Sequence, residues 1–75
     1  MENKFIELIK ETLEIEDREL QLSDKFREYK EWNSLALLSV IATIDEEYDV
    51  VIEGNVFQKL QTLEELYSEI QKRVQ

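Results

Sequence analysis

Apolar residues at three- and four-residue spacing predict an amphipathic helix near the start of the chain. Its apolar stripe consists of Phe5, Leu8, Ile9 and Leu13, and most charged residues of this segment lie off the stripe. The pattern weakens around Glu14–Glu16, and we expect the helix to end there.

The next 18 residues, from Glu16 to Asn33, show no helical period. A connection of this length inside a small domain is usually functional or contains turns of its own. Ser23–Asp24 are suited to capping a short turn within it, and several large apolar residues can anchor it to a core. We therefore expect an ordered loop, pinned by Leu20, Leu22, Phe26, Tyr29 and Trp32.

A second helix is predicted from Ser34 to Tyr48. Because each residue turns an α-helix by about 100°, five apolar residues of this segment fall on one face and predict its core stripe. They are Leu37, Val40, Ile41, Ile44 and Tyr48. A separate face carries two leucines and two acids, and we expect it to point away from the core: Leu35, Leu38, Ala42, Asp45 and Glu46.

The rest of the chain predicts one short and one longer helix. Val50–Ile52 is expected to pack as a loop, and Asn55 to cap a short helix that turns Val56, Phe57 and Leu60 inward. Thr62–Glu65 matches a capping box, in which the threonine oxygen and the glutamate each accept a hydrogen bond from a free N–H group. The expected buried stripe of the last helix is Leu63, Leu66, Tyr67, Ile70 and Val74.

These elements predict an all-α fold, a small four-helix bundle. It consists of three main helices and one short helix, with a long loop between helices 1 and 2. A chain of 75 residues with no Pro and a single Gly is expected to form one domain, residues 1–75, without a multi-stranded sheet.

The charge balance narrows the range of partners. The chain carries 9 basic and 18 acidic residues, a net charge of −9. Such a surface repels nucleic-acid phosphates and attracts proteins with basic patches, although acidity can also serve solubility alone. No apolar run is long enough for a membrane span and no signal peptide is visible, so we expect a cytoplasmic protein. The sequence does not indicate the oligomeric state, for which a monomer is the default expectation.

The composition also argues against catalysis. The chain has no histidine and no cysteine, which removes the commonest general base and the thiolate nucleophile. The acids from Asp45 to Asp49 lack the spacing of a calcium loop around Gly54, and we expect neither a metal site nor catalytic residues.

Ser34 is the candidate that remains. In the simplest interpretation, Asn33 or Ser34 only caps the second helix, because both residue types are preferred there. A helix N-terminus also offers free N–H groups and a positive dipole end, which suit a phosphodiester on the serine oxygen. Leu35 and Leu38, exposed beside this serine, would then form part of a docking surface.

The stretch EWNSLALLSVIATIDEEYDV, residues 31 to 50, resembles the central segment of acyl carrier proteins. The family motif opens a helix with Asp or Asn, then Ser, then Leu or Met, here Asn33 to Leu35. It ends in two acids and an aromatic residue, here Glu46 to Tyr48. Helix order, length and acidity extend the likeness over the whole chain, which reads more like a specialised than a housekeeping carrier.

The resemblance implies that Ser34 carries 4′-phosphopantetheine, transferred from coenzyme A by a phosphopantetheinyl transferase. The arm would hold acyl groups as thioesters, which explains thiol chemistry on a chain without cysteine. Acyl-transferring or acyl-activating enzymes with basic docking patches are the implied partners. The family's partner-facing positions correspond here to Leu35, Leu38, Ala42, Asp45 and Glu46.

Two positions depart from the family pattern. Asn33 stands where an aspartate is usual, and Ser39 where an acid is frequent. The first difference weakens the expected interaction with the transferase and its magnesium ion. Two alternatives stay open: an aminoacyl or peptidyl carrier, and an acidic protein-interaction bundle that is not modified.

Overall fold

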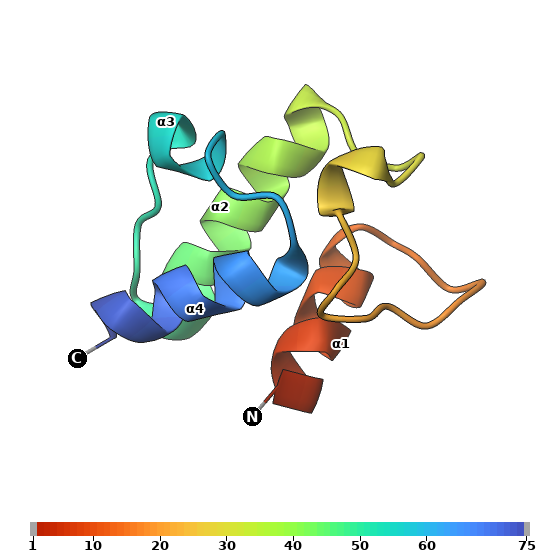
Figure 1. Cartoon of the computed structure of the whole chain (residues 1–75), viewed down its shortest axis with the longest axis horizontal. Helices are drawn as coiled ribbons and strands as arrows, with labels where there is room; N and C mark the ends of the chain where they lie inside the picture. The colour runs from red at the N-terminus through yellow and green to blue at the C-terminus, as the bar shows by residue number, and fades with distance from the viewer. Residues whose placement is uncertain (1, 75) are drawn as a thin grey trace.

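The computed structural model describes residues 2–74, which form four α-helices and one short 3-10 turn (Figure 1). The helices are α1 (Glu2–Thr12), α2 (Ser34–Tyr48), α3 (Gly54–Phe57) and α4 (Leu63–Arg73), and η1 (Phe26–Glu28) lies between α1 and α2. In this part of the chain no residues form a β-strand, and Lys25 and Thr62 make one isolated bridge. The predicted all-α bundle, with a long first loop and a short third helix, is confirmed.

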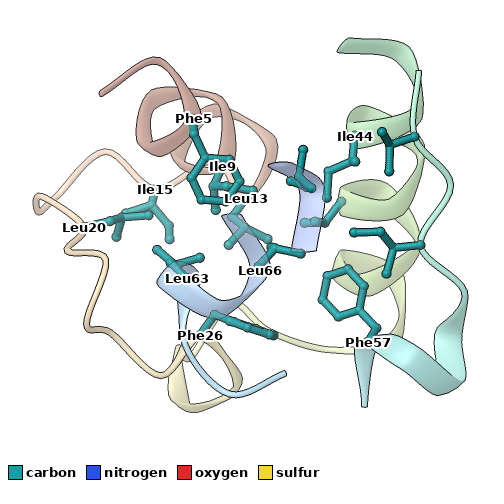
Figure 2. Close-up of a cluster of buried hydrophobic side chains, with 14 residues drawn as sticks. Phe5, Ile9, Leu13, Ile15, Leu20, Phe26, Ile44, Phe57, Leu63 and Leu66 are labelled. Carbon is teal, nitrogen blue, oxygen red and sulfur yellow. The ribbon is translucent and has the colours of Figure 1, made fainter. Parts of the chain in front are cut away.

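The core joins all four α-helices to the two longer loops (Figure 2). The loop between α1 and α2 buries four apolar side chains, and the segment after α2 buries two more, Val50 and Ile52. The predicted loop anchors are therefore confirmed, since Leu20 and Phe26 are buried and the other three are partly buried against the core. The buried residues are Phe5, Ile9, Leu13, Ile15, Leu20, Phe26, Val40, Ile44, Val50, Ile52, Phe57, Leu63, Leu66 and Ile70.

Two residues predicted to lie in the core do not. Leu8 is only partly buried and lines a surface cleft with charged residues of α1 and with Glu47. Val74 is 41% exposed, because α4 ends at Arg73 and the last apolar position of the pattern lies beyond the helix. Conversely, Ile15, which follows α1 and was not part of the predicted stripe, is buried in the core.

Helix α1 ends earlier than predicted, at Thr12, in a Schellman motif. The N–H of Ile15 donates to the carbonyl of Lys10 at 2.9 Å, and the N–H of Glu14 donates to that of Glu11 at 3.1 Å. This geometry places Glu14 in the left-handed region, with φ of 58°. Left-handed backbone is easy for glycine and strained for glutamate.

The first loop closes onto the N-terminus of α4. The carbonyls of Asp24 and Leu22 accept hydrogen bonds from the N–H groups of Leu63 and Glu64, at 3.1 and 2.8 Å. Asp24 does not cap η1 as predicted, and Lys25 takes that place without a side-chain bond. The Asp24 carboxylate instead accepts hydrogen bonds from the Gln21 N–H at 2.9 Å and from a tyrosine hydroxyl of the same loop at 2.8 Å.

The caps of the last two helices differ in part from the prediction. Thr62 Oγ1 accepts from the N–H of Glu65 at 3.2 Å, as expected for a capping box. The Glu65 carboxylate accepts from the N–H of Gln61 at 2.6 Å, one residue before the predicted donor. Asn55 does not cap α3, because this helix already begins at Gly54, preceded by Glu53.

An arginine and three aromatic rings fix α3 beside the start of α2. Arg27 donates from Nε to the carbonyl of Leu60 at 3.1 Å and from Nη2 to that of Phe57, which occupies carbonyls at the end of α3. Phe26 makes edge contacts with Trp32 and Phe57, and Trp32 stacks on Phe57 with ring centroids 6.0 Å apart. Trp32 directly precedes Asn33 and Ser34, so this packing holds the segment that leads into α2.

Candidate functional site

Asn33 caps α2, and Ser34 is its first helical residue. The Asn33 backbone is extended, and its side-chain Oδ1 accepts a hydrogen bond from the N–H of Ala36 at 2.8 Å. The Asn33 carbonyl accepts from the N–H of Leu37 at 2.9 Å, the first bond of the helix. Of the two capping residues that the sequence left open, the structure selects Asn33, so the Ser34 hydroxyl has no capping role.

The start of α2 keeps two backbone donors free. Within residues 2–74, no protein group accepts a hydrogen bond from the N–H of Ser34 or of Leu35, and both side chains are exposed. At the start of α4, in contrast, the first three N–H groups donate to carbonyls of the first loop and to Thr62. Free N–H groups and the positive end of a helix dipole favour an anion at the start of α2.

The outward face of α2 has the exposure that its angular pattern predicts. Leu35 and Leu38 are 72% and 62% exposed, although they are leucines in a small protein with a well-filled core. Ala42, Asp45 and Glu46, on the same face, are also exposed. The exposed face is therefore apolar near Ser34 and acidic about three turns further along α2.

The opposite face of α2 packs into the molecule. Val40 and Ile44 are fully buried, and the other three residues of the predicted core stripe are partly buried against the core: Leu37, Ile41 and Tyr48. The start of α2 lies at the end of the molecule away from the two chain termini (Figure 1). One face of α2 is therefore packed against the core, and the face that carries Leu35 and Leu38 is exposed to solvent.

Charged groups tie the segment before the site to the first loop. The Arg18 guanidinium donates two hydrogen bonds to the Glu31 carboxylate, at 2.7 and 3.2 Å, and lies over the Tyr29 ring. The hydrogen bond from Arg18 holds the pKa of Glu31 below its usual range. Burial, and then the hydrogen bond to Asp24, raise the pKa of the Tyr29 hydroxyl. Surface ion pairs contribute little to the free energy of unfolding. The role of this network is therefore local: it links Arg18 of the first loop to Glu31, close to the start of α2.

The expectation that Val50–Ile52 packs as a loop is wrong for Val51. It lies in the loop after α2 and is 57% exposed, between the buried Val50 and Ile52. The alternation of this short extended segment was the only signal that could have indicated an outward-facing valine. Its carbonyl accepts a hydrogen bond from Arg73 of α4 at 2.8 Å, which fixes the loop beside the end of that helix.

Metal and membrane features were searched over residues 2–74. There, no three or more acidic side chains gather closely enough to form a metal site. In the same range, no helix combines the length and the apolar character that crossing a membrane requires.

The structure is a small helical domain with an exposed serine at the first position of α2. A family model described as a phosphopantetheine attachment site matches residues 3–70, and the chain belongs to this family. The prosthetic group of the family is 4′-phosphopantetheine, which is bound covalently. The exposed serine beside free N–H groups fits the phosphodiester of such a group.

Comparison with solved structures supports the same fold. The solution NMR structure of holo acyl carrier protein from Geobacter metallireducens matches with a TM-score of 0.81. The match covers 96% of this chain and 83% of that chain at 15% sequence identity, which shows a shared fold. None of the curated proteins matches the chain.

Proposed function

We propose that this protein is an acyl carrier protein that holds acyl groups on a 4′-phosphopantetheine arm attached to Ser34 Oγ. The observation that supports this most strongly is that Asn33, and not Ser34, caps the start of α2. Asn33 provides the cap, which leaves the exposed Ser34 hydroxyl next to two free N–H groups. When bound, the arm supplies a thiol that carries acyl groups as thioesters.

The chain itself presents the arm and is recognised by enzymes. Leu35, Leu38 and Ala42 would contact apolar surface of a partner, and Asp45 and Glu46 would meet basic residues around it. The net charge of −9 would speed the encounter with such basic patches and make it sensitive to salt. The partners are a phosphopantetheinyl transferase and acyl-transferring or acyl-activating enzymes, in the cytoplasm and in a dedicated acyl pathway. No residue of this domain is assigned a catalytic role.

Intact-mass measurement tests the proposal. The protein is incubated with coenzyme A, magnesium and a broad-specificity transferase, and its mass is compared before and after. We expect the mass to rise by one 4′-phosphopantetheine in the wild type and in Ser68→Ala, a control that removes an exposed serine of α4. We expect no gain in Ser34→Ala.

Two results would contradict the proposal. Absence of the arm in the wild type would favour an unmodified acidic bundle that binds proteins, the alternative that Asn33 keeps open. An equal gain in Ser34→Ala would place the arm on another of the four serines. Loading the holo protein with fatty acyl or with amino acids by the corresponding ligases then separates an acyl carrier from an aminoacyl or peptidyl carrier.

A further inference from the structure

Three aromatic rings fill the interior between η1, α3 and the segment that leads into α2. Phe26 of η1 and Phe57 of α3 are buried next to each other (Figure 2), and Trp32, two residues before Ser34, is partly buried against both. The ring centroids lie 4.9 Å apart for Phe26 and Trp32, 5.7 Å for Phe26 and Phe57, and 6.0 Å for Trp32 and Phe57. Each ring therefore contacts the other two, and we name the three residues the aromatic cluster.

Arg27 holds α3 against this cluster. Its guanidinium donates hydrogen bonds to the carbonyls of Phe57 and Leu60, and it lies over the Phe26 ring at 5.5 Å from the centroid. A movement of α3 away from η1 would break both hydrogen bonds and separate the rings. Partly buried polar groups that lose their partners destabilise the fold, so this end of the core resists opening.

The inward face of α2 is also filled. Val40 and Ile44 are fully buried, and they belong to the same core as Phe57. Protein interiors are close-packed, and extra methylene groups in a filled core force side chains out of their preferred rotamers. An octanoyl chain has about as many carbon atoms as a phenylalanine side chain, so it needs the room that one ring now occupies.

The surface near Ser34 gives a hydrocarbon chain little cover. Leu35 and Leu38 are exposed there, but they stand on the convex face of a helix, which can contact only one side of a chain. The free-energy cost of an apolar chain in water grows with its exposed area. A short acyl group, or one that carries hydroxyl groups, avoids most of this cost.

We propose that the domain keeps its acyl group outside the core, because the aromatic cluster fills the adjacent interior, and that its cargo is a short or polar acyl group. The inference rests on the proposed attachment at Ser34 and specifies what the arm carries. Trp32 and Phe57 then determine specificity by excluding long chains from the interior.

A series of acyl chains tests the inference. A broad-specificity transferase loads the wild type from butyryl, hexanoyl or octanoyl coenzyme A, and intact mass verifies each product. The rate of thioester cleavage by hydroxylamine is then measured at low protein concentration and divided by the rate for the free acyl coenzyme A. Each buried methylene would favour a covered chain about fourfold, so a core that admits the chain would slow cleavage as the chain lengthens. We expect the same ratio for all three chains and equal melting temperatures.

Two aromatic variants identify what excludes the chain. Trp32→Ala removes one ring of the cluster, and the control Tyr67→Ala removes another partly buried ring, which packs on Phe5 of α1 with centroids 5.0 Å apart. In Trp32→Ala we expect the octanoyl thioester to be cleaved more slowly than the butyryl thioester, and octanoyl loading to raise the melting temperature. Tyr67→Ala should behave like the wild type. Circular dichroism checks that both variants fold, and the wild-type series decides the inference if Trp32→Ala does not.

The outcomes separate the inference from the proposed function. If the wild type gains no acyl arm, attachment at Ser34 is refuted. If it gains the arm and cleavage slows with chain length, the domain covers the chain itself, so the inference is overturned and the carrier function stands. A folded Trp32→Ala without any effect of chain length would show that the aromatic cluster is not what excludes the chain, and this too would overturn the inference.

Discussion

Replacing Asn33 and Ser34 separately by alanine distinguishes a structural residue from a functional one. Asn33→Ala removes the side-chain oxygen that accepts from the Ala36 N–H at 2.8 Å. Loss of such a cap costs about 1 kcal/mol of stability. In a domain of this size, that cost lowers the melting temperature by roughly 4–8 °C.

Ser34→Ala should behave differently, because the serine hydroxyl is exposed and does not cap the helix. Alanine is the better helix former, so we expect stability to stay within about 0.5 kcal/mol of the wild type. We expect the opposite order for modification: Ser34→Ala should abolish attachment of the arm, and Asn33→Ala should permit it.

Asn33→Asp provides the matched control. An aspartate keeps the capping oxygen and adds a negative charge at the positive end of α2, which contributes about 0.3–1 kcal/mol. It also restores the residue usual in acyl carrier proteins. We therefore expect a more stable protein that the transferase modifies faster.

Urea unfolding, followed by far-ultraviolet circular dichroism and by the fluorescence of Trp32, measures all three variants. A change in the midpoint with an unchanged slope reports a change in stability. If Ser34→Ala lost as much stability as Asn33→Ala, the serine would be a cap, and the reasoning from the free hydroxyl would fail.

Three further predictions concern the backbone, the exposed face and the surface charges. Glu14→Gly should raise the free energy of unfolding by about 1 kcal/mol in urea titrations, because glycine adopts the positive φ of this position without strain; a loss of stability would contradict the Schellman assignment. Leu38→Asp should leave the melting temperature nearly unchanged and slow transfer of the arm by the transferase, whereas Val74→Asp should leave both unchanged; equal rates in the two variants would remove the docking role of α2. The Glu69 carboxylate accepts from Arg73 at 2.8 Å, which lowers its pKa, so its stabilising effect is present above about pH 4.5 and is lost as the pH falls through the lowered value. In Arg73→Met, thermal melts from neutral to acid pH should show a smaller loss of stability, and an unchanged pH profile would mean that the pair contributes nothing.

Most of the fold could be predicted from the helical spacing of apolar residues in the sequence. The order of the helices follows from the spacing of apolar residues, and the exposure of Leu35 and Leu38 follows from angles along α2. Both are local properties, because a helix fixes the direction of each side chain relative to its neighbours.

The structure differs from the prediction mainly where contacts between segments far apart in the sequence determine the local conformation. The first two N–H groups of α4 donate hydrogen bonds to carbonyls of the first loop, and Arg27 of η1 donates to a carbonyl just after α3. The spacing of apolar residues in the sequence indicates neither contact. Ile15 enters the core because the Schellman motif turns the chain back after α1, whereas the predicted stripe assumed an unbroken helix. The choice of Asn33 over Ser34 as the cap likewise depends on a difference of one residue, which propensity alone cannot resolve.

Fragment mass spectrometry of the protein purified from its native host tests the central claim most directly. Trypsin cleavage after Lys30 and Lys59 releases a peptide that contains two serines, Ser34 and Ser39. We expect a 4′-phosphopantetheine arm on Ser34, with an acyl group on its thiol. Fragments of the peptide that include Ser34 should carry the mass of the arm, and fragments that contain Ser39 but not Ser34 should not. An arm on Ser39, or a peptide that is unmodified throughout, would contradict it.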